Sequence, residues 1–382
     1  MIETAWICAP RRTPFTRALK GALANRRADA LLAGLFQNLM SSLPESALAA
    51  IDEVIVGCAY PEGEQGRNVA RAITLGAGLP DTVSAMTLTR LCASSLEATA
   101  IACAKVRLGE ASLVLVGGME SMSRIPLGGA NPSPNPAWVE KRSEIYMAMG
   151  ETAERVARRY GVTRAEQDAW ALQSHQRAAA ARARGVFAEE IVPVAVDDSD
   201  WIRDDDSIRP DTSAEKLATL RPAFAADGTV TAGNSCPTSD GASALLVASS
   251  EAIERHELRP LGRFVAYAVA GVDPALMGIG PVEAVPRAMA RANLTLADMD
   301  RIEMNEAFAS QVVAVSRALG LPGDRTNVNG GAIALGHPLG ASGARLVGTV
   351  LRELSRSSGR YGLATLCVGG GMGAAMVVER TE

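Results

Sequence analysis

The sequence lacks the long hydrophobic run that a membrane-spanning segment needs. No apolar stretch among its 382 residues approaches the roughly 20 residues required to cross a bilayer. The first residues, from Met1 to Trp6, also lack a basic segment followed by an apolar one, so no secretory signal peptide is predicted. We therefore expect a cytoplasmic protein without a membrane span.

The sequence also has few cysteines and no excess of positive charge. Its six cysteines stand at positions 8, 58, 92, 103, 236 and 367, and none forms a CxxC pair. We therefore predict neither a metal site nor a disulfide framework, and expect any special cysteine to serve chemistry. The net charge of −4 argues against nucleic acid as a partner, because neutralising phosphates requires a basic surface.

Short apolar segments alternate with helical patterns along the chain. Segments 52–57 (DEVIVG), 113–117 (LVLVG) and 363–368 (LATLCV) read as buried strands, whereas 94–108 has the pattern of a helix. This alternation predicts an α/β fold.

The two halves of the sequence contain the same features in the same order. In the first half a Leu-Pro pair at 79–80 is followed by Cys92 at a helix start, a strand, and Gly-Gly-Met at 117–119. In the second half Leu-Pro at 321–322 precedes His337 at the start of a helix running through Arg352, a strand, and Gly-Gly-Gly-Met at 369–372. We expect two repeated halves about a pseudo-two-fold axis, with Cys92 and His337 facing each other.

The segment between the halves, about 119–240, has a different character. It begins with a Gly- and Pro-rich loop at 126–136. Thr163 and Glu166 then form a capping-box pattern at the start of a long helix, for which Gly185 is a plausible end. We interpret this segment as an inserted, loop-rich subdomain that covers the mouth of the site.

Cys92 and His337 are the first candidates for chemistry. Cys92 directly precedes helical sequence, where free N–H groups and the helix dipole favour a thiolate; an inert buried cysteine is the alternative. His337 lies in the glycine-rich segment 335–343, where a histidine can act as a base or an oxyanion donor. His175 and His256 stand in charged helical contexts and are predicted to be solvated bystanders.

Two further segments place polar groups at the ends of strands. Cys367 precedes the glycine run that contains Gly369, whose exposed N–H groups could bind an oxyanion, although a tight turn explains the glycines equally well. Asn305 and Glu306 follow the strand 302–304, the usual place for functional groups in α/β folds, and a surface loop is the alternative.

The blocks LCAS (91–94), NEAF (305–308), GHPLGASG (336–343) and CVGGGMG (367–373) resemble the signature blocks of thiolases, in the family's order. The likeness extends to segments 117–123, 149–154, 220–224 and 231–234, and so covers almost the whole chain. It implies an αβαβα layered sandwich of two repeated halves with an inserted loop domain. The implied boundaries are 1–118 plus about 240–256 for the N-terminal half, 119–239 for the loop domain and 257–382 for the C-terminal half.

The resemblance also implies the roles of individual residues. Cys92 would attack the 3-keto carbon of a 3-ketoacyl-CoA, His337 would take its proton, Asn305 would hold a water, and Cys367 would be the acid and base for acetyl-CoA and CoA. The N–H groups of Cys92 and Gly369 would form an oxyanion site. Coenzyme A is then a substrate, and no cofactor is expected. By position the CoA-binding residues would be Met149, Arg209, Phe224, Ala232, Cys236 and Phe308.

Three departures from the family pattern concern the nucleophile and its surroundings. Thr89 stands where the family usually has Asn, Ser95 where it has Gly, and Cys236 where a hydroxyl is common. Since Gly permits backbone conformations that Ser disfavours, we expect Ser95→Gly to leave activity equal or higher and stability little changed.

Several functions remain open within and beyond this resemblance. The segment 61–66 favours a degradative 3-ketoacyl-CoA thiolase of fatty acid β-oxidation. The alternatives are an acetoacetyl-CoA-forming acetyltransferase, a 3-oxoadipyl-CoA thiolase, a decarboxylating condensing enzyme, and a non-catalytic CoA- or lipid-binding protein. The resemblance also implies a homodimer or homotetramer, and an association with a β-oxidation hydratase/dehydrogenase is a further hypothesis.

Overall fold

The computed structural model describes residues 3–196 and 200–381, and within them ten strands form a single mixed sheet built from two halves. The N-terminal half has the spatial order β1 (Trp6–Arg12), β8 (Ser239–Ala248), β5 (Leu113–Ser121), β3 (Glu53–Cys58) and β4 (Ser84–Leu88), with the short β2 (Thr16–Arg17) paired to β8. The C-terminal half has the order β9 (Pro260–Gly271), β12 (Met372–Arg380), β11 (Tyr361–Val368) and β10 (Met299–Met304). The strands predicted at 52–57, 113–117 and 363–368 are confirmed as β3, β5 and β11.

The two halves repeat one topology. In the N-terminal half β1 pairs antiparallel with β8, β8 pairs antiparallel with β5, and β5 pairs parallel with β3. In the C-terminal half β9, β12, β11 and β10 pair in the same order and the same directions. In the N-terminal half β4 then pairs parallel with β3; in the C-terminal half an isolated parallel bridge between Ile302 and Thr326 takes that place beside β10. Antiparallel pairing of β1 with β9 joins the halves. The predicted internal repeat is confirmed.

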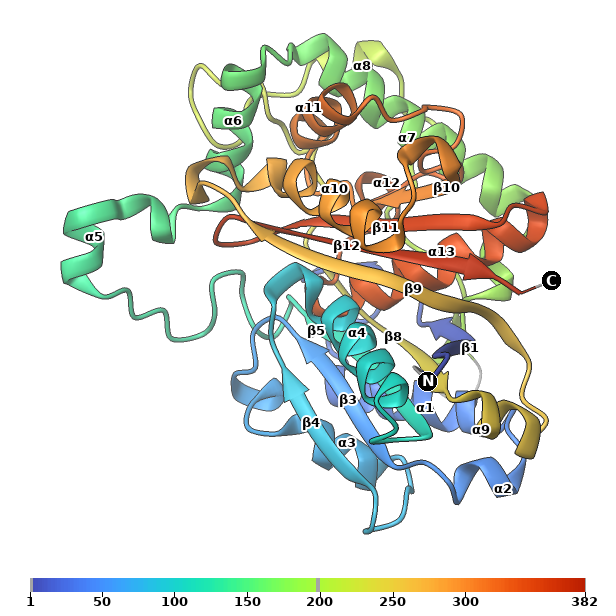
Figure 1. Cartoon of the computed structure of the whole chain (residues 1–382). Coiled ribbons are helices and arrows are strands. Elements are labelled where there is room, and N and C mark those ends of the chain that lie inside the picture. Colours follow the sequence, from blue (N-terminus) through green and yellow to red (C-terminus); the bar gives the residue numbers. More distant parts are fainter. Residues whose placement is uncertain (1–2, 197–199, 382) are drawn as a thin grey trace.

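Helices cover both faces of the two half-sheets (Figure 1). The helices α4 (Ser94–Arg107) and α13 (Ser342–Ser357) pack against each other between the halves, and their buried faces belong to one hydrophobic core. On the outside, α1 (Ala28–Met40) and α3 (Val69–Gly76) cover the N-terminal half, and α10 (Gly280–Ala292) covers the C-terminal half. The layers therefore alternate as αβαβα, as predicted. The remaining helices of the two halves are α2 (Glu45–Leu48), α9 (Ser250–Arg255), α11 (Ala309–Leu319) and α12 (Ala332–Leu335).

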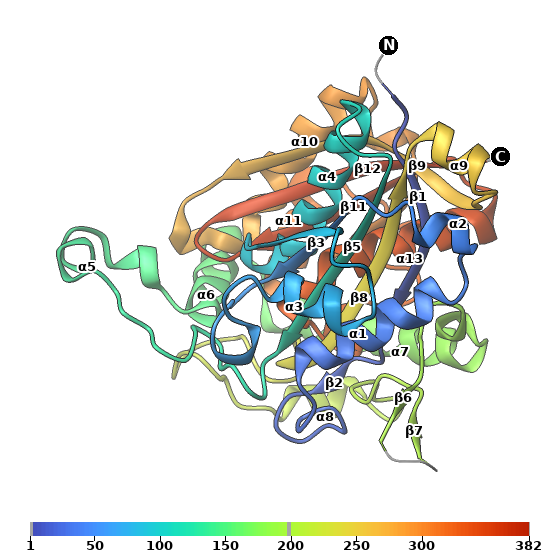
Figure 2. The ribbon, with the colours of Figure 1, turned by 90° about the horizontal axis from the view of Figure 1, so that it is seen from below.

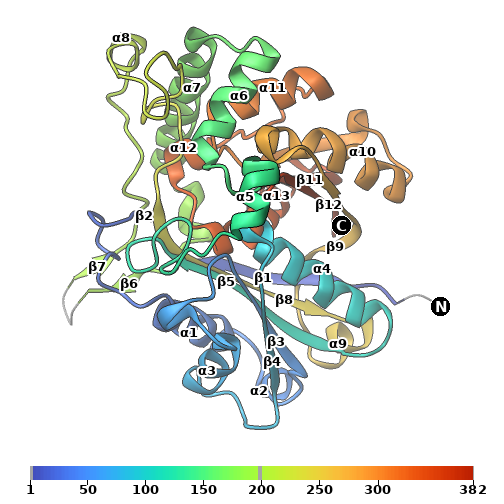
Figure 3. The ribbon, with the colours of Figure 1, turned by 90° about the vertical axis from the view of Figure 1, so that its left-hand side faces the viewer.

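The inserted segment contains α5 (Pro136–Arg142), α6 (Met149–Tyr160), α7 (Arg164–Ala183), α8 (Ala214–Ala218) and the hairpin of β6 (Val194–Ala195) and β7 (Trp201–Ile202). The capping box of Thr163 and Glu166 is present at the start of α7, and Gly185 follows its end with φ +74°. Both α6 and α7 pack on α11. The helix α5 stands on an arm that projects from the body to the left in Figures 1 and 2 and toward the viewer in Figure 3.

Across the described ranges, no helix has both the length and the apolar character that crossing a membrane requires.

Candidate active site

Cys92 lies in a tight, strained turn that leads into α4. It is the middle residue of the 3-10 turn η2 (Leu91–Ala93), and Leu91 has φ +44°, a conformation that costs a non-glycine residue energy. Thr89 stabilises this turn, because its hydroxyl accepts a hydrogen bond from the N–H of Leu91 at 3.2 Å and donates one to the carbonyl of Ala59 at 3.0 Å. The unusual Thr89 thus holds the nucleophile turn through its own hydroxyl.

His337 is buried, and its hydrogen bonds fix its tautomer. Its Nδ1 lies 2.5 Å from Oγ of Ser342, and that hydroxyl donates its proton to the carbonyl of Pro338 at 2.9 Å. This arrangement assigns Ser342 as the acceptor from Nδ1–H and Nε2 as the unprotonated nitrogen. Nε2 is buried and has no hydrogen-bond partner among the described residues. This nitrogen is available as a base.

The two helix-start turns are not equivalent residue for residue. Cys92 precedes α4 by two residues, whereas His337 precedes α13 by five and is followed by a second 3-10 turn, η7 (Leu339–Ala341). The structural equivalent of Cys92 in the repeat is therefore Gly340, three residues after His337. The turns η2 and η7 pack against each other, so the loops that hold Cys92 and His337 meet.

Three thiols from distant segments gather at this point. Cys367, at the end of β11, lies close enough to Cys92 and Cys236 for their charges to interact. The N–H groups of Gly369 and of Cys92 itself are positioned to donate to Sγ of Cys92. The structure therefore brings together Cys92, Cys236, Cys367 and Gly369.

Burial decides the protonation states of this cluster. It raises the pKa of Cys92 to about 11; the N–H groups of Gly369 and Cys92 oppose this increase, and Glu120 adds to it. The expectation that the helix start would favour the thiolate is wrong, because α4 begins only at Ser94 and burial outweighs the N–H groups. Burial also raises the pKa of Cys236 to about 12, and that of Cys367 well above its usual range.

Burial acts on the histidine in the opposite direction, because here it disfavours the protonated form. It lowers the pKa of His337 to about 3, and the positive charge of Arg345 contributes. A protonated thiol and a neutral imidazole therefore coexist at neutral pH, so Cys92 would have to lose its proton to act as a nucleophile.

Asn305 and Glu306 follow β10 but differ in their environment. Both polar atoms of the Asn305 amide are buried and lack a hydrogen-bond partner among the described residues, so they are free to bind a substrate or a water. Glu306 accepts hydrogen bonds from Trp170 Nε1 at 3.0 Å, Ser174 Oγ at 2.6 Å and Asn327 Nδ2 at 2.9 Å. Glu306 therefore ties the loop domain to the C-terminal half, and the surface-loop alternative is wrong for both residues.

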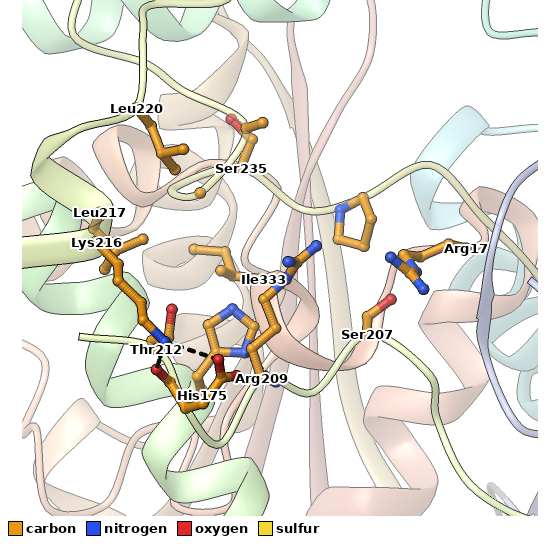
Figure 4. Close-up of a pocket in the computed structure, with 14 residues that line it drawn as sticks. Arg17, His175, Ser207, Arg209, Thr212, Lys216, Leu217, Leu220, Ser235 and Ile333 are labelled. Atoms are coloured by element: carbon orange, nitrogen blue, oxygen red, sulfur yellow. Dashed lines mark hydrogen bonds and ion pairs between the residues drawn. The ribbon is translucent and has the colours of Figure 1, made fainter. Parts of the chain in front are cut away.

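A basic pocket of about 280 Å³ is lined mainly by residues of the loop domain, together with Arg17 and Ile333 (Figure 4). The predicted CoA-binding residues Arg209 and Ala232 line it, and so do Arg17 and Lys216, which sequence reasoning did not single out. The positive charges come from Arg17, Arg209 and Lys216, which do not belong to one local sequence motif, so the sequence alone does not identify them as one site. Lys216 is also paired with Asp211 at 2.8 Å.

His175 lines the same pocket and is not a solvated bystander. It is buried, and its Nδ1 accepts a hydrogen bond from the N–H of Arg209 at 3.2 Å. Burial lowers the pKa of His175 to about 4, and the positive charge of Arg209 lowers it as well, to a smaller extent. His256 is buried as well, with its Nδ1 3.0 Å from Oγ of Ser46, so the prediction was wrong for both histidines.

One chain segment connects the pocket to the thiols. Ala232, Ser235 and Pro237 line the pocket, and Cys236 among them donates its N–H to the carbonyl of Ala307 at 3.0 Å. Phe308, which follows Ala307, forms a bridge with Ser235. The basic pocket and the thiol cluster are thus joined by one chain segment, which lines the pocket with Ser235 and supplies Cys236 to the thiols.

The remaining predicted CoA residues lie along this connection. The rings of Phe224 and Phe308 meet edge to face with centroids 5.9 Å apart, and Gly150 leaves space for the ring of Phe224. Met149 packs against both the apolar cluster that contains Cys92 and the one that contains Cys367. Of the six residues predicted to contact CoA, Arg209 and Ala232 line the pocket, and Cys236 and Phe308 belong to the segments that connect it to the thiols.

Comparisons with known proteins agree over the whole chain. The family models "Thiolase, N-terminal domain" and "Thiolase, C-terminal domain" match residues 5–251 and 258–380. A Bacillus subtilis protein named 3-ketoacyl-CoA thiolase is 48% identical over 99% of this chain and 100% of its own length. A Pseudomonas knackmussii protein named beta-ketoadipyl-CoA thiolase is 47% identical over 100% of both chains. The solved structure of human mitochondrial 3-ketoacyl-CoA thiolase in complex with CoA matches with a TM-score of 0.91 and 39% identity, covering 100% of this chain and 98% of that one.

Proposed function

The chain belongs to the thiolase family and is an acyltransferase, and we propose that it cleaves a 3-ketoacyl-CoA with CoA into acetyl-CoA and a shortened acyl-CoA. The reverse condensation follows from the same machinery. The observation that carries this proposal is the contact between η2, which holds the buried, protonated Cys92, and η7, the turn that follows a neutral His337 whose Nε2 has no hydrogen-bond partner among the described residues.

In the first half-reaction Cys92 transfers its proton to Nε2 of His337 as Sγ attacks the 3-keto carbon. The negative charge on the former keto oxygen is stabilised by the protonated imidazole and by a water held by the amide of Asn305. The bond between the second and third carbons then breaks, leaving an acyl group on Cys92 and an acetyl-CoA enolate. Cys367 donates a proton to the enolate, which releases acetyl-CoA.

In the second half-reaction the thiolate of Cys367 removes the thiol proton of an incoming CoA, and the CoA sulfur attacks the acyl-cysteine. The shortened acyl-CoA is released, and the departing sulfur of Cys92 recovers its proton from His337. The N–H groups of Cys92 and Gly369 stabilise the oxyanion of this step, and such donors typically contribute about 3–4 kcal/mol each. The elevated pKa of Cys367 suits its first role, because a protonated thiol is required to deliver the proton. No cofactor takes part in this scheme, and CoA is a substrate.

For CoA binding we assign the charged end of the molecule to the basic pocket around Arg209 and Lys216. The pantetheine arm would then pass Cys236 and Phe308 toward the thiols. The positive charge of the pocket, and the chain segment 232–237 that runs from the pocket to Cys236, support this orientation.

For the substrate class we propose an unsubstituted acyl chain and hence a role in β-oxidation, which the similar Bacillus subtilis protein named 3-ketoacyl-CoA thiolase supports. Cys367 itself lies in an apolar cluster with Ala153, Val230, Met277, Ala307 and Phe308, against which Met149 packs. The similar relatives named beta-ketoadipyl-CoA thiolase support a second candidate, a 3-ketoacyl-CoA that carries a distal carboxylate.

We also propose that the chain works in the cytoplasm as a homodimer or homotetramer, alongside a β-oxidation hydratase/dehydrogenase. The outer edge of β4 has no paired strand among the described residues, and such an edge can pair with a second copy. Light scattering coupled to gel filtration tests this proposal, and a monomer at micromolar concentration would contradict it.

The decisive experiment incubates the protein with acetoacetyl-CoA without free CoA and maps the modified peptide by mass spectrometry. One acetyl group on Cys92 is expected, and none on Cys92→Ala. A protein that binds acetoacetyl-CoA without modification would be a binding protein, and acetylation of Cys103 instead would refute the nucleophile. Comparing kcat/KM for acetoacetyl-CoA and 3-oxoadipyl-CoA then decides between the two substrate classes.

A further inference from the structure

Glu120, at the end of β5, is a buried carboxylate surrounded only by hydrogen-bond donors. Its Oε2 accepts from the N–H groups of Ala59 at 2.8 Å and Gly340 at 3.0 Å. Its Oε1 accepts from Nε2 of Gln65 at 2.7 Å and from the N–H of Tyr60 at 3.4 Å. The residue is 0% exposed. So many donors at one carboxylate fix its position to within the geometry of those bonds.

The bond to Gly340 joins the two halves of the molecule at the catalytic loops. Gly340 is the middle residue of η7, which lies between His337 and Ser342 in the chain. Ser342 in turn accepts the hydrogen bond from Nδ1–H of His337 that sets the tautomer of this residue. A displacement of η7 would therefore move both the histidine and its partner.

The packing around Gly340 is so close that η7 has no room to shift toward the strands beneath it. A Cβ atom at this position would lie 2.2 Å from the carbonyl oxygen of Met119 and 2.9 Å from that of Gly57, so η7 rests directly on the ends of β5 and β3. Ser243 Oγ also donates to the carbonyl of Ala341 at 2.5 Å. Glu120 satisfies the N–H of the turn, and Ser243 satisfies its last carbonyl.

The internal repeat relates two contacts between a strand end and a helix-start turn, and Glu120 lies at one of them. The end of β11 packs on η2, where the N–H of Gly369 faces Sγ of Cys92; the end of β5 packs on η7, where the carboxylate of Glu120 faces the N–H of Gly340. The contact between β11 and η2 presents the nucleophile Cys92, and the related contact between β5 and η7 anchors the loop of the base His337.

We propose that Glu120 is a positioning residue for the acyl transfer, holding η7 and thereby His337 in register with Cys92. This inference rests on the proposed function, since it assigns Glu120 a part in that reaction. Glu120 does not contact the reacting atoms. It acts through Gly340, η7 and Ser342.

The test compares Glu120→Gln with the matched control Asp240→Asn. Asp240 is also a fully buried carboxylate, and it accepts hydrogen bonds from Ser123 N at 2.9 Å and Ser121 Oγ at 3.2 Å without reaching η2 or η7. In Glu120→Gln one carboxylate oxygen becomes an NH₂ group facing N–H donors, so at least one anchoring bond is lost. We measure kcat and KM for thiolysis and, separately, the rate of Cys92 alkylation by iodoacetamide at pH 8.

The expected signature is a divergence between these two measurements. Misplacing the base should lower kcat at least about 100-fold in Glu120→Gln, with KM within about threefold of the wild type. Alkylation of Cys92 should be as fast or faster, because a negative charge near the thiol has been removed. Asp240→Asn should retain kcat within about threefold of the wild type.

A merely structural role would slow alkylation and thiolysis in parallel, and that result would overturn the proposal, as would a kcat close to the wild-type value. If Glu120→Gln does not fold, Glu120→Asp keeps the charge but shortens the reach toward Gly340. That variant should show wild-type alkylation with reduced kcat, and full activity would refute the proposal. Failure of the wild type to acetylate Cys92 would instead refute the proposed function.

Discussion

Replacing Ser95 with Gly should destabilise the protein, contrary to what the family pattern led us to expect. Ser95 lies within α4, so its backbone is helical and does not require glycine. Its buried Oγ accepts the N–H of Ala344 at 2.9 Å, and Ala344 belongs to the first turn of α13, where N–H groups have no partner within the helix. The hydroxyl therefore links the two central helices.

The size of the effect follows from these contacts. Leaving the buried N–H of Ala344 unsatisfied costs about 1–3 kcal/mol. Glycine in place of serine inside a helix adds roughly 0.5 kcal/mol. We therefore expect Ser95→Gly to lower the free energy of unfolding by about 2–3 kcal/mol. Ser95→Ala is the matched control, because it loses the same hydrogen bond but has a better helix propensity, and it should be about 1 kcal/mol more stable than Ser95→Gly.

Urea unfolding followed by tryptophan fluorescence measures all three proteins. The reasoning requires the order wild type, then Ser95→Ala, then Ser95→Gly, with similar slopes against urea concentration. If Ser95→Ala unfolds at the wild-type midpoint, the hydrogen bond to Ala344 contributes nothing and the argument is refuted.

Three further predictions concern the reaction itself. Cys367→Ala should lose at least about 100-fold in thiolysis yet still acetylate Cys92 slowly from acetyl-CoA; near-normal thiolysis would exclude Cys367 as the acid and base. Lys216→Ala should raise the KM for CoA with kcat unchanged, whereas exposed Lys20→Ala, outside the pocket, should alter neither. The alkylation rate of Cys92 should climb with pH toward its pKa of about 11, since only the thiolate reacts, and a plateau near pH 8 would contradict the effect of burial.

For Cys92, the sequence predicted which residue matters but not its protonation state. The motif and its place before a helix identified the residue, and the thiolase blocks identified His337, Cys367 and Asn305 as its companions. The protonation state was predicted in the wrong direction, because a helix start is a local feature whereas desolvation comes from residues throughout both halves. His175 was misjudged for the same reason, since its neighbours along the helix are charged but its neighbours in space bury it.

The sequence by itself determined the order of helices and strands, the internal repeat, the capped start of α7 and the family of the protein. These properties depend on periodicity, on turn residues and on short contiguous blocks, all of which are visible along the chain. Only the tertiary structure decided how Thr89 and Ser95 serve their positions, which cations share the pocket with Arg209, and that Glu120 reaches Gly340. Each of those facts depends on contacts between residues that can lie more than 200 positions apart, and burial and hydrogen bonding are set by such contacts rather than by neighbours in the chain.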